Sequence, residues 1–125
     1  MQEIYNSFHK SLSRFEEILK AERTIANRDS AIKRFEITVE LMWKSLQTFL
    51  RDKGFVCRSP KDCLKQAFEY GLISDDVEWF DMIEDRNVTV HTYDETNADE
   101  VFDRLPGYLQ LLQQLSMKLL SGSET

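Results

Sequence analysis

The densest group of chemically reactive side chains in this sequence lies within residues 85–94. Arg86, Asn87, His91 and Tyr93 bring a guanidinium, a carboxamide, an imidazole and a phenol into one short stretch. An imidazole changes charge near neutral pH, and a guanidinium keeps its charge and binds the oxygens of carboxylates and phosphates. Because these polar groups interrupt an otherwise helical pattern, the stretch is a candidate functional site.

Arg86 falls on the apolar side of the helix that this stretch predicts. The apolar stripe on the helical wheel consists of Trp79, Ile83, Val90 and Tyr93. A guanidinium at a stripe position must meet a carboxylate, a partner chain or an anionic ligand, because it does not lose its charge. The position therefore predicts a specific partner for Arg86.

Each of these side chains also has a structural interpretation, and the sequence leaves both open. Arg86 could form a salt bridge with Glu36 or Glu40, two acids spaced one helical turn apart. Those acids could instead lie on a solvated face. His91 could be a packed or solvated histidine, and Tyr93 could be half-buried core with an exposed hydroxyl.

The helical period restricts how these groups can meet. On a continuous helix Arg86 and Tyr93 lie about 20° apart, whereas His91 lies about 140° from Arg86. All three can face one cavity only if the helix is distorted or a second chain closes the site.

The composition predicts one helical domain over residues 1–120, followed by a flexible tail at 121–125. Only 4 Gly and 2 Pro occur among 125 residues, and 42% of the residues are hydrophobic. We find no apolar run that could span a membrane and no secretory signal, so we expect a cytoplasmic protein without a membrane partner.

The elements that must position the candidate site are amphipathic helices joined by short connections. The pattern predicts an all-α fold, an antiparallel up-and-down four-helix bundle with one additional short helix. Capping residues and glycines set the expected bounds. The predicted helices run over about 2–23, from caps at 27–29 to 54, over 59–70, from 74 through the candidate site, and from a capping box at 97–100 to the tail.

Charge is distributed unevenly around a formal net charge of −6. Residues 33–65 carry eight basic and four acidic side chains, whereas residues 69–104 carry twelve acidic and two basic ones. This pattern disfavours a generic nucleic-acid-binding protein and indicates an acidic face that could dock a basic protein partner. We expect reduced thiols at Cys57 and Cys63, and we expect neither a metal site nor a cofactor.

Two segments resemble one protein superfamily. The spacing Arg86-Asn87-x3-His91 resembles the R-x4–6-H signature of HEPN-domain proteins, and Tyr93 extends it to R-x4-H-x-Y. Residues 34–44 are similar to the second helix of the nucleotidyltransferase substrate-binding branch of that superfamily. The resemblance covers about residues 2–120, and the two segments together are more specific than the R-x4-H element alone.

The resemblance implies a homodimeric bundle that is encoded beside a small nucleotidyltransferase. Several HEPN relatives are metal-independent ribonuclease toxins, and the nucleotidyltransferase is the antitoxin. In that case Arg86 and His91 would be catalytic, and Tyr93 would be the residue that the partner adenylylates. Asn87, Glu36 and Glu40 would support the site or bind substrate.

Two other functions remain open at this point. The chain could be a non-catalytic subunit that binds substrate or a nucleotide for the nucleotidyltransferase. It could also be a plain interaction bundle, but that function would not account for residues 86–93.

Overall fold

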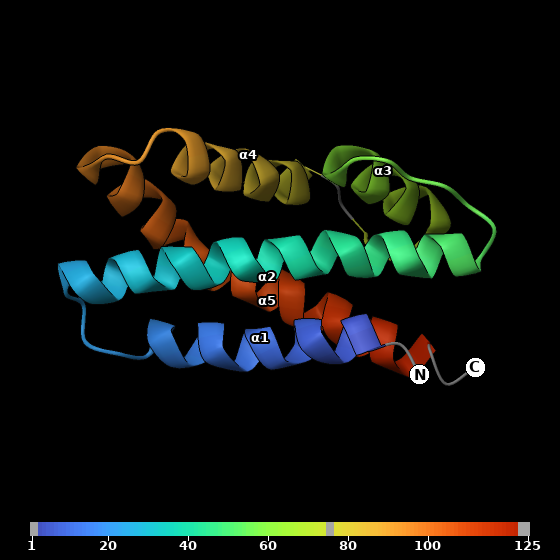
Figure 1. Ribbon diagram of the computed structural model, residues 1–125, viewed down its shortest axis with the longest axis horizontal. Coiled ribbons are helices and arrows are strands. Elements are labelled where there is room, and N and C mark those ends of the chain that lie inside the picture. Colours follow the sequence, from blue (N-terminus) through green and yellow to red (C-terminus); the bar gives the residue numbers. More distant parts are fainter. Residues whose placement is uncertain (1–2, 75–76, 123–125) are drawn as a thin grey trace.

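Five α-helices make up the computed structural model, which describes residues 3–74 and 77–122 (Figure 1). Helices α1, α2, α4 and α5 alternate in direction, and the short α3 lies end to end with α4 along one side of α2. The predicted all-α bundle with one additional short helix is therefore confirmed. The helices are α1 (Glu3–Leu19), α2 (Ile25–Asp52), α3 (Pro60–Tyr70), α4 (Val77–His91) and α5 (Glu95–Gly122).

The core forms around α2, which contacts each of the other four helices. The apolar residues that recur at helical spacing along α2, its apolar stripe, are all buried, and so are those of α5. The α2 stripe consists of Ile32, Phe35, Val39, Met42, Leu46 and Leu50, and the α5 stripe of Val101, Leu105, Tyr108, Leu112, Leu115 and Leu119. The Phe35 ring of α2 stacks on the Tyr108 ring of α5 at a centroid distance of 5.6 Å and tilts against Phe15 of α1 at 6.1 Å. In the part of the chain that the structure describes, no helix is both long and apolar enough to cross a lipid bilayer.

Several helix ends differ from their predicted positions because other residues provide the caps. Thr24 caps α2 by accepting a hydrogen bond from the Asn27 amide at 3.0 Å, so the predicted caps at 27–29 lie inside the helix. Asp94 accepts from the Asn97 amide at 2.8 Å, and α5 consequently starts before the predicted capping box.

Other predicted ends are confirmed or lie partly outside the described residues. Ser59 caps α3, Pro60 occupies its first turn, and Gly71 ends it in the left-handed conformation, as predicted. The first helix stops at Leu19, before the predicted end near residue 23. Residues 121 and 122, which the prediction assigns to the tail, belong to α5, and residues 123–125 are not described. The predicted start of the fourth helix at 74 is followed by residues 75–76, which are not described, and α4 is described from Val77.

Cys57 and Cys63 form a disulfide, so the prediction of reduced thiols is wrong in this structure. The chain turns back at the start of α3, which brings the two Cα atoms to 5.0 Å and buries both side chains. A cross-link that closes so short a loop stabilises the folded state by about 2 kcal/mol in the chain-entropy model. The disulfide joins the α2–α3 connection to the first turn of α3.

Candidate functional site

Arg86 projects from α4 towards α2 with only 20% of its side chain exposed. Its nearest carboxylate oxygen, Oε2 of Glu40, lies 3.6 Å from one terminal nitrogen, which is an ion pair but longer than a hydrogen bond. Its Nε is buried and has no hydrogen-bond partner among the described residues. The guanidinium is therefore incompletely satisfied by its own chain.

The carboxylate of Glu40 interacts with three neighbouring side chains. Its carboxylate accepts a hydrogen bond from the indole nitrogen of Trp43 at 3.0 Å and lies 3.4 Å from the ammonium of Lys44. The Trp43 bond, followed by Lys44 and the charge of Arg86, lowers the pKa of Glu40 despite its partial burial. The structural interpretation of Arg86 as a partner of Glu40 is thus correct, but the pair leaves Arg86 incompletely satisfied.

The second predicted acid, Glu36, contacts a different residue of α4. The buried hydroxyl of Thr89 donates to Glu36 Oε2 at 2.8 Å, which fixes the end of α4 against α2. Val90, which the predicted stripe placed in the core, is 53% exposed because the buried face of α4 turns towards Thr89 instead. Trp79 and Ile83 are buried as predicted.

Helix α4 is regular as far as His91. This regularity fixes the angle between the side chains of Arg86 and His91 around the helix axis. The two residues are five positions apart in the chain, so their side chains leave the helix about 140° apart. His91 is exposed and Asn87 is half-buried, and neither side chain bonds to another residue that the structure describes. Helix distortion therefore does not bring Arg86 and His91 into one cavity within this chain.

Tyr93 does not continue the stripe, because the chain leaves the helix after His91. Its phenol turns to the start of α2 and donates a hydrogen bond to Asp29, while 46% of the residue stays exposed. Burial and this bond raise the pKa of Tyr93 to about 12. The same bond is the main cause that lowers the pKa of Asp29. The predicted alignment of Tyr93 with Arg86 is wrong.

The sequence analysis did not predict the buried guanidinium of Arg28 beside Tyr93. Arg28 is only 4% exposed and bonds to Asp29 at 2.9 Å, Glu95 at 2.7 Å and Asp99 at 3.0 Å. The Glu95 bond contributes most to raising the pKa of Arg28. The sequence contained one signal for the burial of Arg28. Residue 28 stands four positions before Ile32 and therefore continues the α2 stripe.

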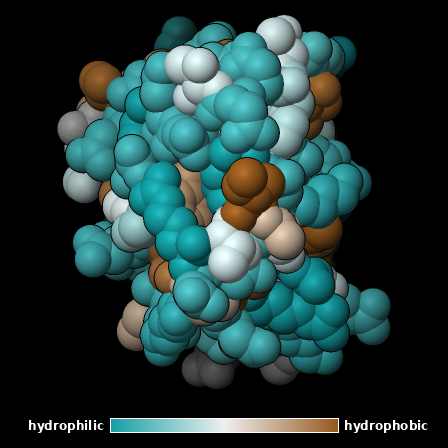
Figure 2. All heavy atoms as spheres, turned by 90° about the vertical axis from the view of Figure 1, so that its left-hand side faces the viewer, coloured by the Kyte–Doolittle hydropathy of each residue, from teal (hydrophilic) through white to brown (hydrophobic). Residues whose placement is uncertain are grey.

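This cluster lies at the end of the molecule where the α1–α2 and α4–α5 connections meet the starts of α2 and α5. Figure 2 shows that the surface at this end is mostly hydrophilic. The acidic side chains of the cluster are 45–74% exposed, so solvent reaches them while the guanidinium stays covered. Tyr93 is thus held in a polar, accessible surface.

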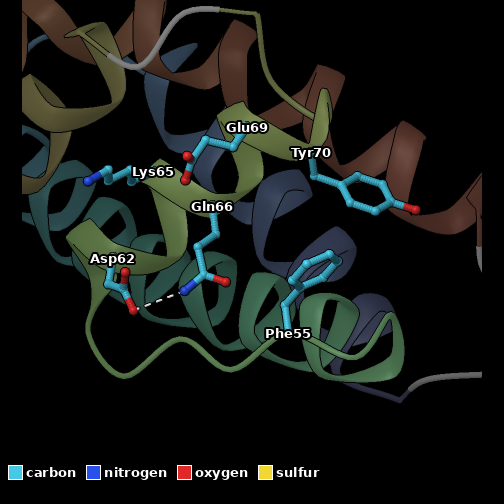
Figure 3. A pocket seen from close by; sticks show the side chains of 6 residues that line it. All are labelled: Phe55, Asp62, Lys65, Gln66, Glu69 and Tyr70. Atoms are coloured by element: carbon cyan, nitrogen blue, oxygen red, sulfur yellow. Dashed lines mark hydrogen bonds between the residues drawn. The ribbon is translucent and has the colours of Figure 1, made fainter.

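A hollow of about 650 Å³ lies away from the predicted site residues. It lies on the outer face of α3 and the α2–α3 connection, where the Gln66 amide donates to Asp62 at 3.1 Å (Figure 3). No group of three or more His, Cys, Asp or Glu side chains within residues 3–74 and 77–122 could hold a metal ion. The hollow is lined by Phe55, Asp62, Lys65, Gln66, Glu69 and Tyr70.

Comparisons with known proteins agree on one family. Residues 3–121 match the family model described as nucleotidyltransferase substrate binding protein like. A Haemophilus influenzae protein named "Probable ribonuclease HepT" is 32% identical over 102 residues, which cover 70% of this chain and 66%, just under two thirds, of that protein.

Two solved structures share the fold. A Thermus thermophilus protein has a TM-score of 0.83 at 40% identity, over 90% of this chain and 98% of that one. A Haemophilus influenzae protein, described as revealing the fold of a substrate binding domain of a nucleotidyltransferase, has a TM-score of 0.78 over 92% and 98%. At 24% identity, this second likeness concerns the fold alone.

The Tyr93–Asp29 bond predicts a pH-dependent loss of stability in Tyr93→Phe. The variant should unfold more easily at pH 7, by about 1 kcal/mol or less, because one partly exposed hydrogen bond is lost. A lowered carboxyl pKa contributes stability above the ordinary pKa, which is lost as the pH falls through the folded value. The difference should therefore shrink as the pH falls below about 4, the ordinary carboxyl pKa, and also from about pH 10 to about pH 12 as Tyr93 ionises.

Urea unfolding of both proteins across this pH range measures the effect. Tyr70→Phe is the matched control, because Tyr70 is also 46% exposed and its hydroxyl bonds to no described residue. A difference between wild type and Tyr93→Phe that is equal at pH 7 and in acid would contradict the assignment.

Proposed function

Because the chain belongs to the nucleotidyltransferase substrate binding protein-like family, we propose that it is a HEPN-type subunit of a two-protein nucleotidyltransferase module. The family match confirms the predicted resemblance. Within this role we favour a metal-independent ribonuclease that acts as a toxin and is neutralised by a small nucleotidyltransferase encoded nearby. The name of the Haemophilus relative supports ribonuclease activity over simple binding.

The state of Arg86 is the observation that carries this proposal. A guanidinium that is four-fifths covered, with a long ion pair and an unpartnered Nε, is poorly satisfied by its own chain. A phosphodiester offers oxygens that match the fork of guanidinium donors. Glu40 would orient Arg86, and Asn87 would support the substrate on the neighbouring side of α4.

The proposed reaction uses a nucleophile that the RNA supplies. The 2′-oxygen forms a bond to the adjacent phosphorus while the bond from phosphorus to the 5′-oxygen breaks, giving a cyclic phosphate and a free 5′-hydroxyl. His91 would take the proton of the 2′-hydroxyl or give one to the leaving 5′-oxygen, and water would carry out the other proton transfer. Arg86 would stabilise the charge that develops on the phosphoryl oxygens. This chemistry needs no cofactor.

The site requires a second chain in this proposal. Within one chain the side chains of Arg86 and His91 diverge, whereas a two-fold dimer can place the arginine of one chain beside the histidine of the other. An exposed apolar stripe does not support the dimer, because Trp79 and Ile83 are buried within the chain itself. The divergence of the two catalytic groups supports it instead.

Adenylylation of Tyr93 would regulate the site. The phenol oxygen would attack the α-phosphorus of ATP, pyrophosphate would leave, and Asp29 is placed to accept the phenol proton. The modified tyrosine would carry bulk and negative charge two residues from His91. It would also lose the donor that it now gives to Asp29, which would weaken the attachment of the α4–α5 connection to α2.

A second candidate function is non-catalytic binding of substrate or a nucleotide for the nucleotidyltransferase. The twelve acidic side chains of residues 69–104 favour it, because they repel a polyanion. In that role Arg86 would bind a nucleotide phosphate, and His91 would not be needed.

The ribonuclease proposal predicts cleavage of RNA by the purified protein in EDTA. His91→Ala and Arg86→Ala should each lower the rate by about 100-fold or more, because one proton-transfer or charge-stabilising group is lost. His9→Ala and Arg58→Ala are matched controls that should cleave normally, since His9 lies on α1 and Arg58 on the α2–α3 connection. Full cleavage by His91→Ala, or none by wild type, would leave the binding function.

The regulatory proposal predicts that the partner nucleotidyltransferase, with Mg²⁺ and ATP, adds AMP to Tyr93. Mass spectrometry of peptides should locate the added mass there, and Tyr93→Phe should stay unmodified and active in the presence of the partner. Tyr70→Phe, which removes an equally exposed phenol, should be modified like wild type. Unchanged modification of Tyr93→Phe would exclude Tyr93 as the target.

The dimer proposal predicts a light-scattering mass of twice the 14.8 kDa chain. Mixing inactive Arg86→Ala with inactive His91→Ala should restore about a quarter of the activity, because half of the randomly formed dimers are mixed and each has one intact shared site. Mixing either variant with the double variant should restore nothing. A monomer, or no recovery in the first mixture, would contradict a shared site.

A further inference from the structure

We infer that Arg14, Ser30 and Arg34 form a second phosphate-binding subsite, which holds a backbone phosphate of the RNA away from Arg86 and His91. The identity of the ligand rests on the proposed function, whereas the anion site itself rests on the geometry below. Arg34 belongs to the basic region of residues 33–65, which contains neither of the proposed catalytic residues.

The subsite is a hollow of about 410 Å³ where the last turn of α1 and the first turns of α2 lie side by side. Two arginines and one serine line it, together with one glutamate and two aliphatic residues. A space of this size accommodates a phosphate group with part of the attached chain. The lining residues are Arg14, Glu17, Ile18, Ala21, Ser30 and Arg34.

The two arginines lack counterions within the described residues. Arg34 is half-buried and Arg14 is exposed, and neither side chain forms a hydrogen bond or an ion pair to another described residue. By contrast, Arg28 and Arg104 each bond to carboxylates at 2.7 Å. Two like charges that line one hollow repel each other, and an anion between them removes that repulsion. Glu17 also lines the hollow, but it forms no salt bridge with either arginine.

The surface of α2 connects this hollow to the candidate site. Glu40 marks the side of α2 that faces α4, and Arg34 lies about 120° further around the helix. Lys33 and Lys44 project into the sector between these two sides, and both are exposed. A single strand bound at Arg86 would therefore cross a basic surface to reach Arg34, while the acidic residues 69–104 disfavour other directions.

The chemistry of the hollow suits a phosphate rather than a base. Guanidinium groups and a serine hydroxyl donate hydrogen bonds to phosphate oxygens, and the lining offers no aromatic ring on which a base could stack. Such contacts position a strand without reading its sequence. Free phosphate shares this chemistry, so an experiment must separate the two sources.

Binding of a short fluorescent single-stranded RNA, measured by anisotropy over a salt series, tests the inference in a His91→Ala background that prevents cleavage. Arg34→Gln should weaken binding about two- to tenfold, and each lost phosphate contact should reduce the slope of log K against log salt by about 0.7. Arg14→Gln should act in the same direction. Arg58→Gln removes an equal charge from the α2–α3 connection and should leave the slope unchanged.

A titration of wild type with inorganic phosphate separates this inference from the proposed function. If RNA binds and the slope is the same in the Arg14→Gln/Arg34→Gln double variant, the subsite is refuted while the ribonuclease proposal stands. If RNA does not bind at all, the proposed function fails and the NMR signals of the arginine side chains decide. Phosphate-dependent shifts of Arg34 that Ser30→Ala weakens would then support an anion site, and the absence of shifts would refute it.

Discussion

The buried charge of Arg28 is the constraint on which the end of the bundle that carries Tyr93 depends. A guanidinium that is 4% exposed is stable only with its carboxylates in place, and these come from α2 and from the first two turns of α5. Once Arg28 holds Asp29, the same carboxylate can accept the phenol of Tyr93. The ion cluster thus fixes the start of α5, the α4–α5 connection and the accessible phenol together.

Helix α2 organises the rest of the molecule because each of its sides has a different task. Its apolar stripe fills the core, and the side that faces α4 meets Arg86 with Glu40 and Thr89 with Glu36. The remaining sector, which carries Lys33 and Lys44, is open to solvent. One helix therefore positions the candidate catalytic arginine and also presents a basic surface next to it.

The sequence predicts the elements well where a local pattern determines the structure. The α2 stripe and the Ser59–Pro60 start of α3 are such cases, because helical spacing and capping chemistry depend on near neighbours. Prediction from the sequence fails where a residue far away in the chain determines the position of a side chain. The exposure of Val90 follows from the bond between Thr89 and Glu36, and the course of Tyr93 follows from Asp29, 64 positions earlier in the chain. Local sequence patterns do not predict such long-range contacts.

Helix geometry also explains which of the predicted site residues meet and which do not. Arg86 and Glu40 meet as one structural interpretation of the sequence anticipated, because both occupy regular helical positions on facing helices. Arg86 and His91 share α4 and cannot converge, since a regular helix fixes the angle between them. Two side chains about 140° apart on one regular helix do not line one site within a single chain, so the proposed catalytic pair would need a second chain. Catalytic activity would therefore depend on dimer formation, because the chain that supplies the arginine would need another chain to supply the histidine.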